Sequence, residues 1–183
     1  MTDEIRTARL LLRRWREDDR EPFAAMNADP EVMRHFPAAL TREQSDALLD
    51  RFDAAFDELG YGRWAVEADG ELVGFTGLAW TPFQADFTPA LEVGWRLVRR
   101  AWGRGYATEA GRAALVRGLE EVETVVSFTA TTNTASERVM QRLGMTAAGE
   151  FEHPALPEGH RLRRHLLYRT DRPGADVSGR APA

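Results

Sequence analysis

Alternating apolar and polar positions at the start of the chain give way to helical spacing further along. The alternation over residues 9–15 predicts a first strand. Residues that commonly begin helices come next. Asp18 and Asp19 precede a helix that is expected to run to about residue 26, and Asp29-Pro30 precedes a short second helix.

A longer helix is predicted after Thr41, because Thr41-Arg42-Glu43-Gln44 has the spacing of a capping box. Its apolar residues share one face, and the helix should end near Gly60. The remaining predicted elements are, in chain order, a hairpin of residues 62–67 and 71–80 that turns at Ala68-Asp69-Gly70, a polar loop over 82–89, a strand–turn–helix from Glu92, a strand over 123–130, a helix over 134–142 ended by Gly144, and strands over 146–152 and 160–168.

This order of elements predicts a mixed α/β or α+β fold rather than a uniform βαβ repeat. We expect a single domain over residues 1–170, since 183 residues suit one domain with a sizeable core. Residues 171–183 are rich in Pro, Gly, Ser and Ala, which predicts a disordered tail.

Composition narrows the classes of partner. The apolar fraction of 43% is ordinary for a globular protein, and no apolar run approaches the roughly 20 residues that span a bilayer. The chain has no cysteine, so it has no disulfide, thiol nucleophile or zinc–thiolate site, and we expect no metal. A net charge of −5 argues against nucleic acid and mildly favours cationic partners such as amines. We expect a cytoplasmic protein without a membrane partner. The oligomeric state stays open, a homodimer being the commonest assembly.

The most informative stretch runs from Glu92 to Ala110, where an alternating strand meets a basic turn and then a small-residue helix. Gly103 and Gly105 allow positive φ in the turn and leave room for a ligand beside the backbone. The N–H groups of residues 103–108 would be free at the helix start and would attract an anion. A plain strand–turn–helix with two loop glycines fits the same pattern.

Two other phosphate-binding motifs do not fit this turn. A P-loop requires a Lys-Ser/Thr pair after its second glycine, and Gly105 is followed by Tyr106-Ala107. A dinucleotide fingerprint requires a later carboxylate at a strand end, whereas the next strand ends in Thr129-Ala130-Thr131. The anion is therefore expected to belong to a different kind of ligand.

The segment Arg100-Ala101-Trp102-Gly103-Arg104-Gly105 resembles the Arg/Gln-x-x-Gly-x-Gly/Ala signature of the GNAT N-acetyltransferase superfamily. Its flanks, together with Asn133 to Met145 and the opening Thr7 to Arg13, resemble the RimJ/RimL branch, which acetylates the N-termini of ribosomal proteins. The resemblance covers the chain to about Tyr168. It implies a mostly antiparallel sheet of about seven strands with a splayed parallel pair, flanked by about four helices.

The resemblance also implies acetyl-CoA as the cofactor. The residues that would hold it through the turn and the preceding strand are Leu97, Val98, Arg99, Arg100, Gly103, Arg104, Gly105, Tyr106, Ala107 and Thr108. Asn133, Ser136 and Arg138 would contact it from the next helix. Asn133 is free for the ligand if Thr134 caps that helix, but Asn133 is also a common cap. Arg138 fits a solvated helix face as well.

Acetyl transfer to an amine needs a base, because a primary amine with a pKa of about 10.4 is mostly protonated at pH 7. Glu92 is the leading candidate, since it alternates with an apolar set and should face the substrate, although pairing with an arginine is an equal alternative. Its rivals are Glu150, Glu152 and His153. Backbone N–H groups around Leu97 are candidates for the developing oxyanion.

The proton donor is less clearly marked. Many superfamily members have a tyrosine acid at the position of Met140, which cannot donate a proton. In the resembled branch the serine of Asn-x-x-Ser has this role, and Ser136 matches it, although it could be a plain helix-start residue.

The acceptor groove is expected to be lined by Glu92, His35, Trp80 and Phe83, with a surface position for His35 and core packing for the aromatic pair as alternatives. The predicted function is acetyl transfer from acetyl-CoA to a primary amine, either a protein N-terminus of the ribosomal type or a small-molecule amine. The alternative is a non-catalytic acyl-CoA-binding module, which the methionine at position 140 suggests.

Overall fold

The computed structural model describes residues 4–174, so most of the predicted 171–183 tail lies outside the described residues. The strands are β1 (Ile5–Arg6), β2 (Leu11–Arg13), β3 (Arg63–Ala68), β4 (Glu71–Trp80), β5 (Leu91–Leu97), β6 (Thr124–Ala130), β7 (Thr146–Glu152) and β8 (Arg164–Asp171). The helices are α1 (Arg20–Ala28), α2 (Pro30–Met33), α3 (Arg42–Leu59), α4 (Tyr106–Glu121) and α5 (Thr134–Arg142), with 3₁₀ turns at Glu17–Asp19 and Arg99–Ala101.

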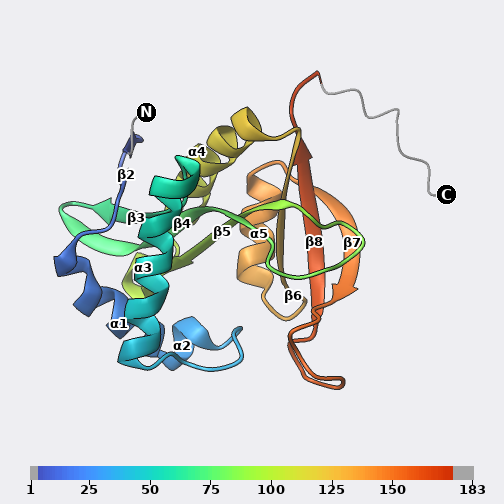
Figure 1. Ribbon diagram of the computed structural model, residues 1–183, viewed down its shortest axis with the longest axis horizontal. Coiled ribbons are helices and arrows are strands. Elements are labelled where there is room, and N and C mark those ends of the chain that lie inside the picture. The colour runs from blue at the N-terminus through green and yellow to red at the C-terminus, as the bar shows by residue number, and fades with distance from the viewer. Residues whose placement is uncertain (1–3, 175–183) are drawn as a thin grey trace.

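The described strands form one eight-stranded sheet in the order β1-β2-β3-β4-β5-β6-β8-β7 (Figure 1). Every neighbouring pair is antiparallel except β5 and β6. These two parallel strands pair only at Leu91 with Val125 and at Glu92 with Val126, and beyond that point they separate. The predicted fold class and the splayed parallel pair are confirmed. The strand beyond the expected seven is the two-residue β1.

Alternation along β5 divides the sheet into two faces. Leu91, Val93 and Leu97 belong to the core cluster under α4 and α5. The intervening positions Glu92, Gly94 and Arg96 face the other side, where α1 and α3 pack on Phe75 and its neighbours. Following the expectation from the sequence, we call the face under α4 and α5 the cofactor face, and the face that carries Glu92 and packs against α1 and α3 the acceptor face.

Local sequence signals explain most helix boundaries. Thr41 caps α3 through a reciprocal capping box with Gln44, and Gly60 ends the helix in the left-handed region at φ 75°. Asp29 caps α2 just before Pro30. These caps appear where the sequence predicts them, because each depends on residues within one helical turn. No helix among residues 4–174 is long and apolar enough to cross a membrane.

The first predicted strand, over residues 9–15, is confined to Leu11–Arg13. A predicted helix cap and the predicted start of the last strand are wrong. Asp19 precedes α1, but its carboxylate accepts hydrogen bonds from the buried Arg13 guanidinium at 2.7 and 2.9 Å instead of capping the helix. The last strand begins at Arg164 and not at residue 160, because the preceding residues form turns such as the Arg163 N–H to His160 carbonyl bond. Both errors come from interactions that the one-dimensional pattern does not encode.

Candidate active site

The basic turn before α4 has the geometry of an anion seat. Gly103 and Gly105 have φ values of 73° and 79°, as a turn with positive φ requires. Gly105 is the N-cap of α4 and supplies no side-chain cap. Within residues 4–174, the N–H groups of Gly105, Tyr106, Ala107 and Thr108 donate to no acceptor. A Cβ added at Gly103 would meet no atom within 4 Å, so the space beside the turn is open.

Arg9 holds this turn from the N-terminal segment. Its Nη1 donates to the Arg104 carbonyl at 2.8 Å, and its guanidinium lies 4.9 Å from the Tyr106 ring centroid. Glu109 of α4 accepts from the Arg9 backbone N–H and Nε and from the Thr7 hydroxyl. The turn is therefore fixed by the N-terminal segment together with the helix that follows the turn.

The predicted turn residues differ in what they can offer a ligand. Arg99 and Arg104 are exposed, so their side chains can approach a phosphate. Arg100 points away, because its Nη2 donates to the Leu72 carbonyl and to Glu71. The Tyr106 side chain is buried in the core, which leaves only its backbone N–H on the turn.

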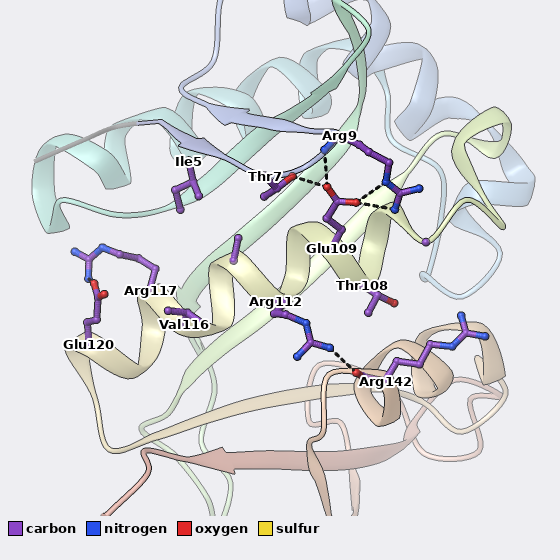
Figure 2. A pocket seen from close by; sticks show the side chains of 12 residues that line it. Ile5, Thr7, Arg9, Thr108, Glu109, Arg112, Val116, Arg117, Glu120 and Arg142 are labelled. Carbon is purple, nitrogen blue, oxygen red and sulfur yellow. Dashed lines mark hydrogen bonds and ion pairs between the residues drawn. The ribbon is translucent and has the colours of Figure 1, made fainter.

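A cavity of about 820 Å³ adjoins the turn on the outer side of α4. It includes Gly105 and Thr108 at one end, and four arginines and two glutamates lie along it. Figure 2 shows Thr7 and Arg9 converging on Glu109 at one rim, and Arg112 reaching the Arg142 carbonyl at another. A phosphate-bearing ligand seated on the turn has room to continue here.

The end of β5, which precedes the turn in the chain, has an open edge. The Val98 N–H donates to the Val73 carbonyl on β4. Because successive residues of a strand point their backbone groups to opposite edges, the N–H and carbonyl of Leu97 point away from β4, toward the gap between β5 and β6. Trp102 Nε1 donates to the Leu97 carbonyl at 2.8 Å. The N–H of Leu97, which we predict as an oxyanion donor, faces the gap between β5 and β6.

Ser136 lies on the far side of this gap and is tied to β5. Trp95 Nε1 donates to Ser136 Oγ at 3.0 Å, and the Ser136 N–H donates to Asn133 Oδ1 at 3.2 Å. Of the two alternatives for this helix start, the structure contains the Asn133 cap. Asn133 is the N-cap, and its Nδ2 donates to Thr129. Arg138 is exposed on α5.

Glu92 lies on the acceptor face, as the alternation predicts. Its Oε2 accepts from Arg63 Nη2 at 2.8 Å, and both side chains are mostly buried. The Glu92 carboxylate is therefore engaged by a guanidinium instead of being left for a substrate ammonium. The pairing with an arginine, which the sequence left open, is what the structure contains.

His35 also faces this region, from the segment after α2. Its Nδ1 lies 3.3 Å from Thr132 Oγ1, beyond the end of β6. Its Nε2 accepts from Arg34 Nε at 3.0 Å. Burial, followed by the charges of Arg34 and Arg161, lowers the pKa of His35. This histidine therefore bridges the α2 segment and the β6–α5 loop rather than standing alone on the surface.

The loop over residues 82–89 covers the other end of the acceptor face with an aromatic–histidine cluster. Its members are Phe83, Phe87, Phe128, Phe151, His153 and His165. Phe83 is 4.6 Å from His153 and the two histidine rings are 4.9 Å apart, between centroids. Sequence reasoning missed His165, although its alternation with Leu166 and its pairing with Phe151 place it on this face.

Trp80 does not belong to this wall, so the expectation for it is wrong. Trp80 pairs with Leu91 and alternates in step with Leu78 of the core cluster, so it lies on the cofactor face, where its Nε1 donates to the Tyr61 hydroxyl at 3.2 Å. Tyr61 in turn lies under Arg117 of α4. The strand alternation that places Glu92 on the acceptor face thus places Trp80 on the opposite one.

The remaining base candidates are engaged elsewhere. Glu150 pairs with Arg164, and Glu152 pairs with Arg163 at 2.7 Å. Met140 is fully buried in the core cluster under α4. At this position the chain therefore has an apolar side chain that fills the core.

A splayed parallel pair beside helix-start amides that donate to no acceptor within residues 4–174 offers a seat for an extended, phosphate-bearing ligand. The family model described as an acetyltransferase (GNAT) domain matches residues 9–146. The chain therefore belongs to the GNAT acetyltransferase family, and the predicted enzyme class, an N-acetyltransferase, is confirmed.

Relatives and solved structures agree with this assignment. The FsC-acetyl coenzyme A-N(2)-transacetylase of Aspergillus fumigatus is 30% identical over 98% of this chain and 84% of its own length. An acetyltransferase of the GNAT family from Bacillus anthracis has a TM-score of 0.75 at 25% identity, covering 93% of this chain and 99% of that one. A RimL ribosomal-protein acetyltransferase in complex with coenzyme A has a TM-score of 0.73 at 16% identity, covering 92% and 97%, and so shows the same fold.

Proposed function

We propose that this protein transfers the acetyl group of acetyl-CoA directly to a primary amine, either a protein N-terminus of the ribosomal type or a small-molecule amine. The observation that carries the proposal is the row of N–H groups from Gly105 to Thr108, which donate to no acceptor within the described part of the chain, together with the separation of β5 from β6. GNAT acetyltransferases use acetyl-CoA, and the residues present suit its parts.

The cofactor would lie along one continuous path. The amides at the start of α4 would hold its pyrophosphate, with the helix dipole and the exposed Arg99 and Arg104 adding attraction. The backbone of Leu97 and Val98 would flank its pantetheine arm, and the cavity beyond Thr108 offers room for its nucleotide end. When bound, the cofactor supplies an acetyl group activated as a thioester.

Ser136 would act as the proton donor for the departing thiolate. Its Oγ accepts from Trp95 Nε1, which fixes the side chain and occupies a lone pair. Its own hydroxyl hydrogen donates to no acceptor within residues 4–174. The Leu97 N–H on the opposite side of the gap would stabilise negative charge on the thioester oxygen.

The acceptor would approach from the other face of the sheet. His35, Phe83 and Glu92 line that side, and the net charge of −5 favours an ammonium-bearing molecule. The named reactions of the A. fumigatus relative and of RimL both modify an amino group. The choice between a peptide N-terminus and a small amine is the part that an assay must decide.

A thiol-release assay with acetyl-CoA and a panel of N-terminal peptides and small primary amines tests the proposal. We expect turnover with at least one amine. Ser136→Ala should lower kcat roughly tenfold, below the roughly 10²–10⁴ range typical of acid–base groups, because a thiolate leaves with little help. Thr134→Ala, at an exposed position on the same helix turn, is the control and should keep full activity. Acetyl-CoA binding without turnover of any amine would favour the non-catalytic module instead.

A further inference from the structure

We propose that His165 is the catalytic base, which takes a proton from the acceptor ammonium onto its Nε2 atom. This inference rests on the proposed function and adds to it the residue that activates the amine. It replaces Glu92 in that role, because the Glu92 carboxylate is bound to Arg63.

The tautomer of His165 follows from its hydrogen-bond partner. Its Nδ1 lies 3.0 Å from the Arg163 carbonyl oxygen, and a carbonyl can only accept. Nδ1 must therefore carry the proton, which leaves the lone pair of the neutral ring on Nε2. Within residues 4–174, Nε2 of His165 has no hydrogen-bond partner, so that lone pair is available to a substrate.

The other histidines of the chain have their lone pairs engaged. All four histidines lie within the described residues. His35 accepts at Nε2 from Arg34, and His160 accepts at Nδ1 from the Leu162 N–H at 3.2 Å. His153 accepts at Nδ1 from the Ala155 N–H at 3.3 Å, so its Nε2 carries the proton. Two histidines 4.9 Å apart in one cluster thus hold opposite tautomers, and only that of His165 suits a base.

His165 is also in the right part of the sheet. It pairs with Ala130, the last residue of β6, and Asn133 begins the turn into α5 three residues later. On the acceptor face, β6 lies between His165 and Glu92, whose carboxylate is close enough to influence the ring electrostatically. Packing against Phe128 and Phe151, with centroids 6.1 and 5.5 Å away, fixes the ring.

The surrounding charges suit a group that is neutral at rest and gains a proton during the reaction. Burial is the largest influence and lowers the pKa of His165, and the neighbouring His153 lowers it further. The Arg163 carbonyl and the carboxylates of Glu92 and Glu152 act in the opposite direction, and the net pKa is lowered. The ring is therefore unprotonated at neutral pH, while Glu92 stabilises the imidazolium once it forms.

The proton balance is complete without another reactant. His165 Nε2 takes one proton from the ammonium, and the freed nitrogen lone pair forms the new C–N bond to the acetyl carbon. The C–S bond breaks with its electron pair on sulfur. Ser136 gives its hydroxyl proton to the thiolate, and the second nitrogen proton, lost as the amide forms, restores the serine hydroxyl. The imidazolium finally returns its proton to solvent.

Two matched variants test this assignment. His165→Asn keeps a donor for the Arg163 carbonyl but has no basic nitrogen, and His160→Asn, outside the acceptor face, keeps an acceptor for the Leu162 N–H. With the fastest amine of the panel, we expect His165→Asn to lower kcat/KM by about 100-fold or more at pH 7. It should also remove the inflection that titration of His165 adds to the acid side of the wild-type pH profile, leaving only the fall set by protonation of the amine. His160→Asn should stay within about threefold of wild type.

Two readouts that do not depend on turnover accompany these rates. Long-range ¹H–¹⁵N correlation spectra at pH 7.5 should show Nδ1–H at His165 and Nε2–H at His153. Calorimetry should show unchanged CoA affinity in both variants. An Nε2–H tautomer at His165, or a His165→Asn variant that retains wild-type rate and pH profile, overturns the inference while the proposed function stands. Loss of CoA binding by the wild-type protein refutes the proposed function itself.

Discussion

The ion pair between Arg9 and Glu109 connects the N-terminal segment to the turn that begins α4, and its removal should destabilise the protein measurably. Glu109 accepts from the Thr7 hydroxyl at 2.6 Å, from the Arg9 N–H at 2.8 Å and from Arg9 Nε at 2.7 Å. Its side chain is 17% exposed, against 49% for Arg9. Glu109→Ala removes all of these acceptors at once, because it ends at Cβ.

The magnitude follows from those contacts. Hydrogen bonds to a charged group contribute about 1.5–3 kcal/mol when buried, but the exposed guanidinium contributes at most about 1 kcal/mol. The Arg9 N–H and the Thr7 hydroxyl lose a partly buried partner. Because Arg9 is half exposed, its ion pair contributes less than a buried one would. We therefore expect Glu109→Ala to lower the free energy of unfolding by about 2 kcal/mol. Higher helix propensity of alanine offsets only a few tenths of this.

Urea unfolding at pH 7 measures the change, with Glu120→Ala as the control on the same helix. Glu120 pairs with Arg117 but is 64% exposed, so its removal should cost less than about 0.5 kcal/mol. Burial acts to raise the pKa of Glu109, but hydrogen bonds from Thr7 and Arg9 outweigh it and lower the pKa. The wild type should therefore exceed Glu109→Ala in free energy of unfolding by the full amount above about pH 4.3, the pKa of an unfolded glutamate. This difference should shrink as the pH falls through the lower pKa that Glu109 has in the folded protein. Equal stability of the two variants would refute this reasoning.

Three further substitutions test other parts of the structure. Gly74→Ala should cost more than about 3 kcal/mol in thermal unfolding, because its Cβ would stand 2.2 Å from the Arg96 carbonyl oxygen; wild-type stability would contradict the close approach of β4 and β5. Arg96→Met should raise the free energy of unfolding by about 1 kcal/mol at pH 7, since burial, followed by Arg63, lowers the pKa of Arg96 to about 9 and disfavours its charge in the folded state. That gain should shrink as the pH rises above 9, and a loss of stability would show that its bond to Asn27 outweighs the buried charge. Met140→Ala should cost about 2–5 kcal/mol with kcat unchanged, and a tenfold fall in kcat would contradict a packing role.

Features that depend on neighbouring residues could be predicted from the sequence. The turn at Gly103 and Gly105, the capping box at Thr41 and the Gly60 helix end each need only a few consecutive side chains. The alternation that puts Glu92 opposite the core is likewise a property of one strand. The separation of β5 from β6 could be predicted only from the family resemblance. No local pattern within either strand shows whether its backbone will pair with a neighbouring strand.

Features that depend on long-range partners could not be predicted. The partner of Glu92 is 29 positions away at Arg63, and nothing in the local pattern favours that arginine over others. The expected face of Trp80 is wrong because the face of an aromatic residue at a strand end can be inferred only when the register of the strand is known. His165 was missed because its distinguishing feature is a tautomer, which a backbone carbonyl at Arg163 determines.

The seat formed by the α4 amides is the central claim, and calorimetric titration of acetyl-CoA into three versions of the full chain tests it most directly. Gly105→Glu places a carboxylate beside the free N–H groups, at φ 79°. Gly70→Glu imposes the same backbone strain in the β3–β4 turn, at φ 80° with no atom within 4 Å. We predict that the wild type and Gly70→Glu bind acetyl-CoA with equal affinity and that Gly105→Glu binds at least about 100-fold more weakly. Equal binding by Gly105→Glu, or none by the wild type, would contradict the account.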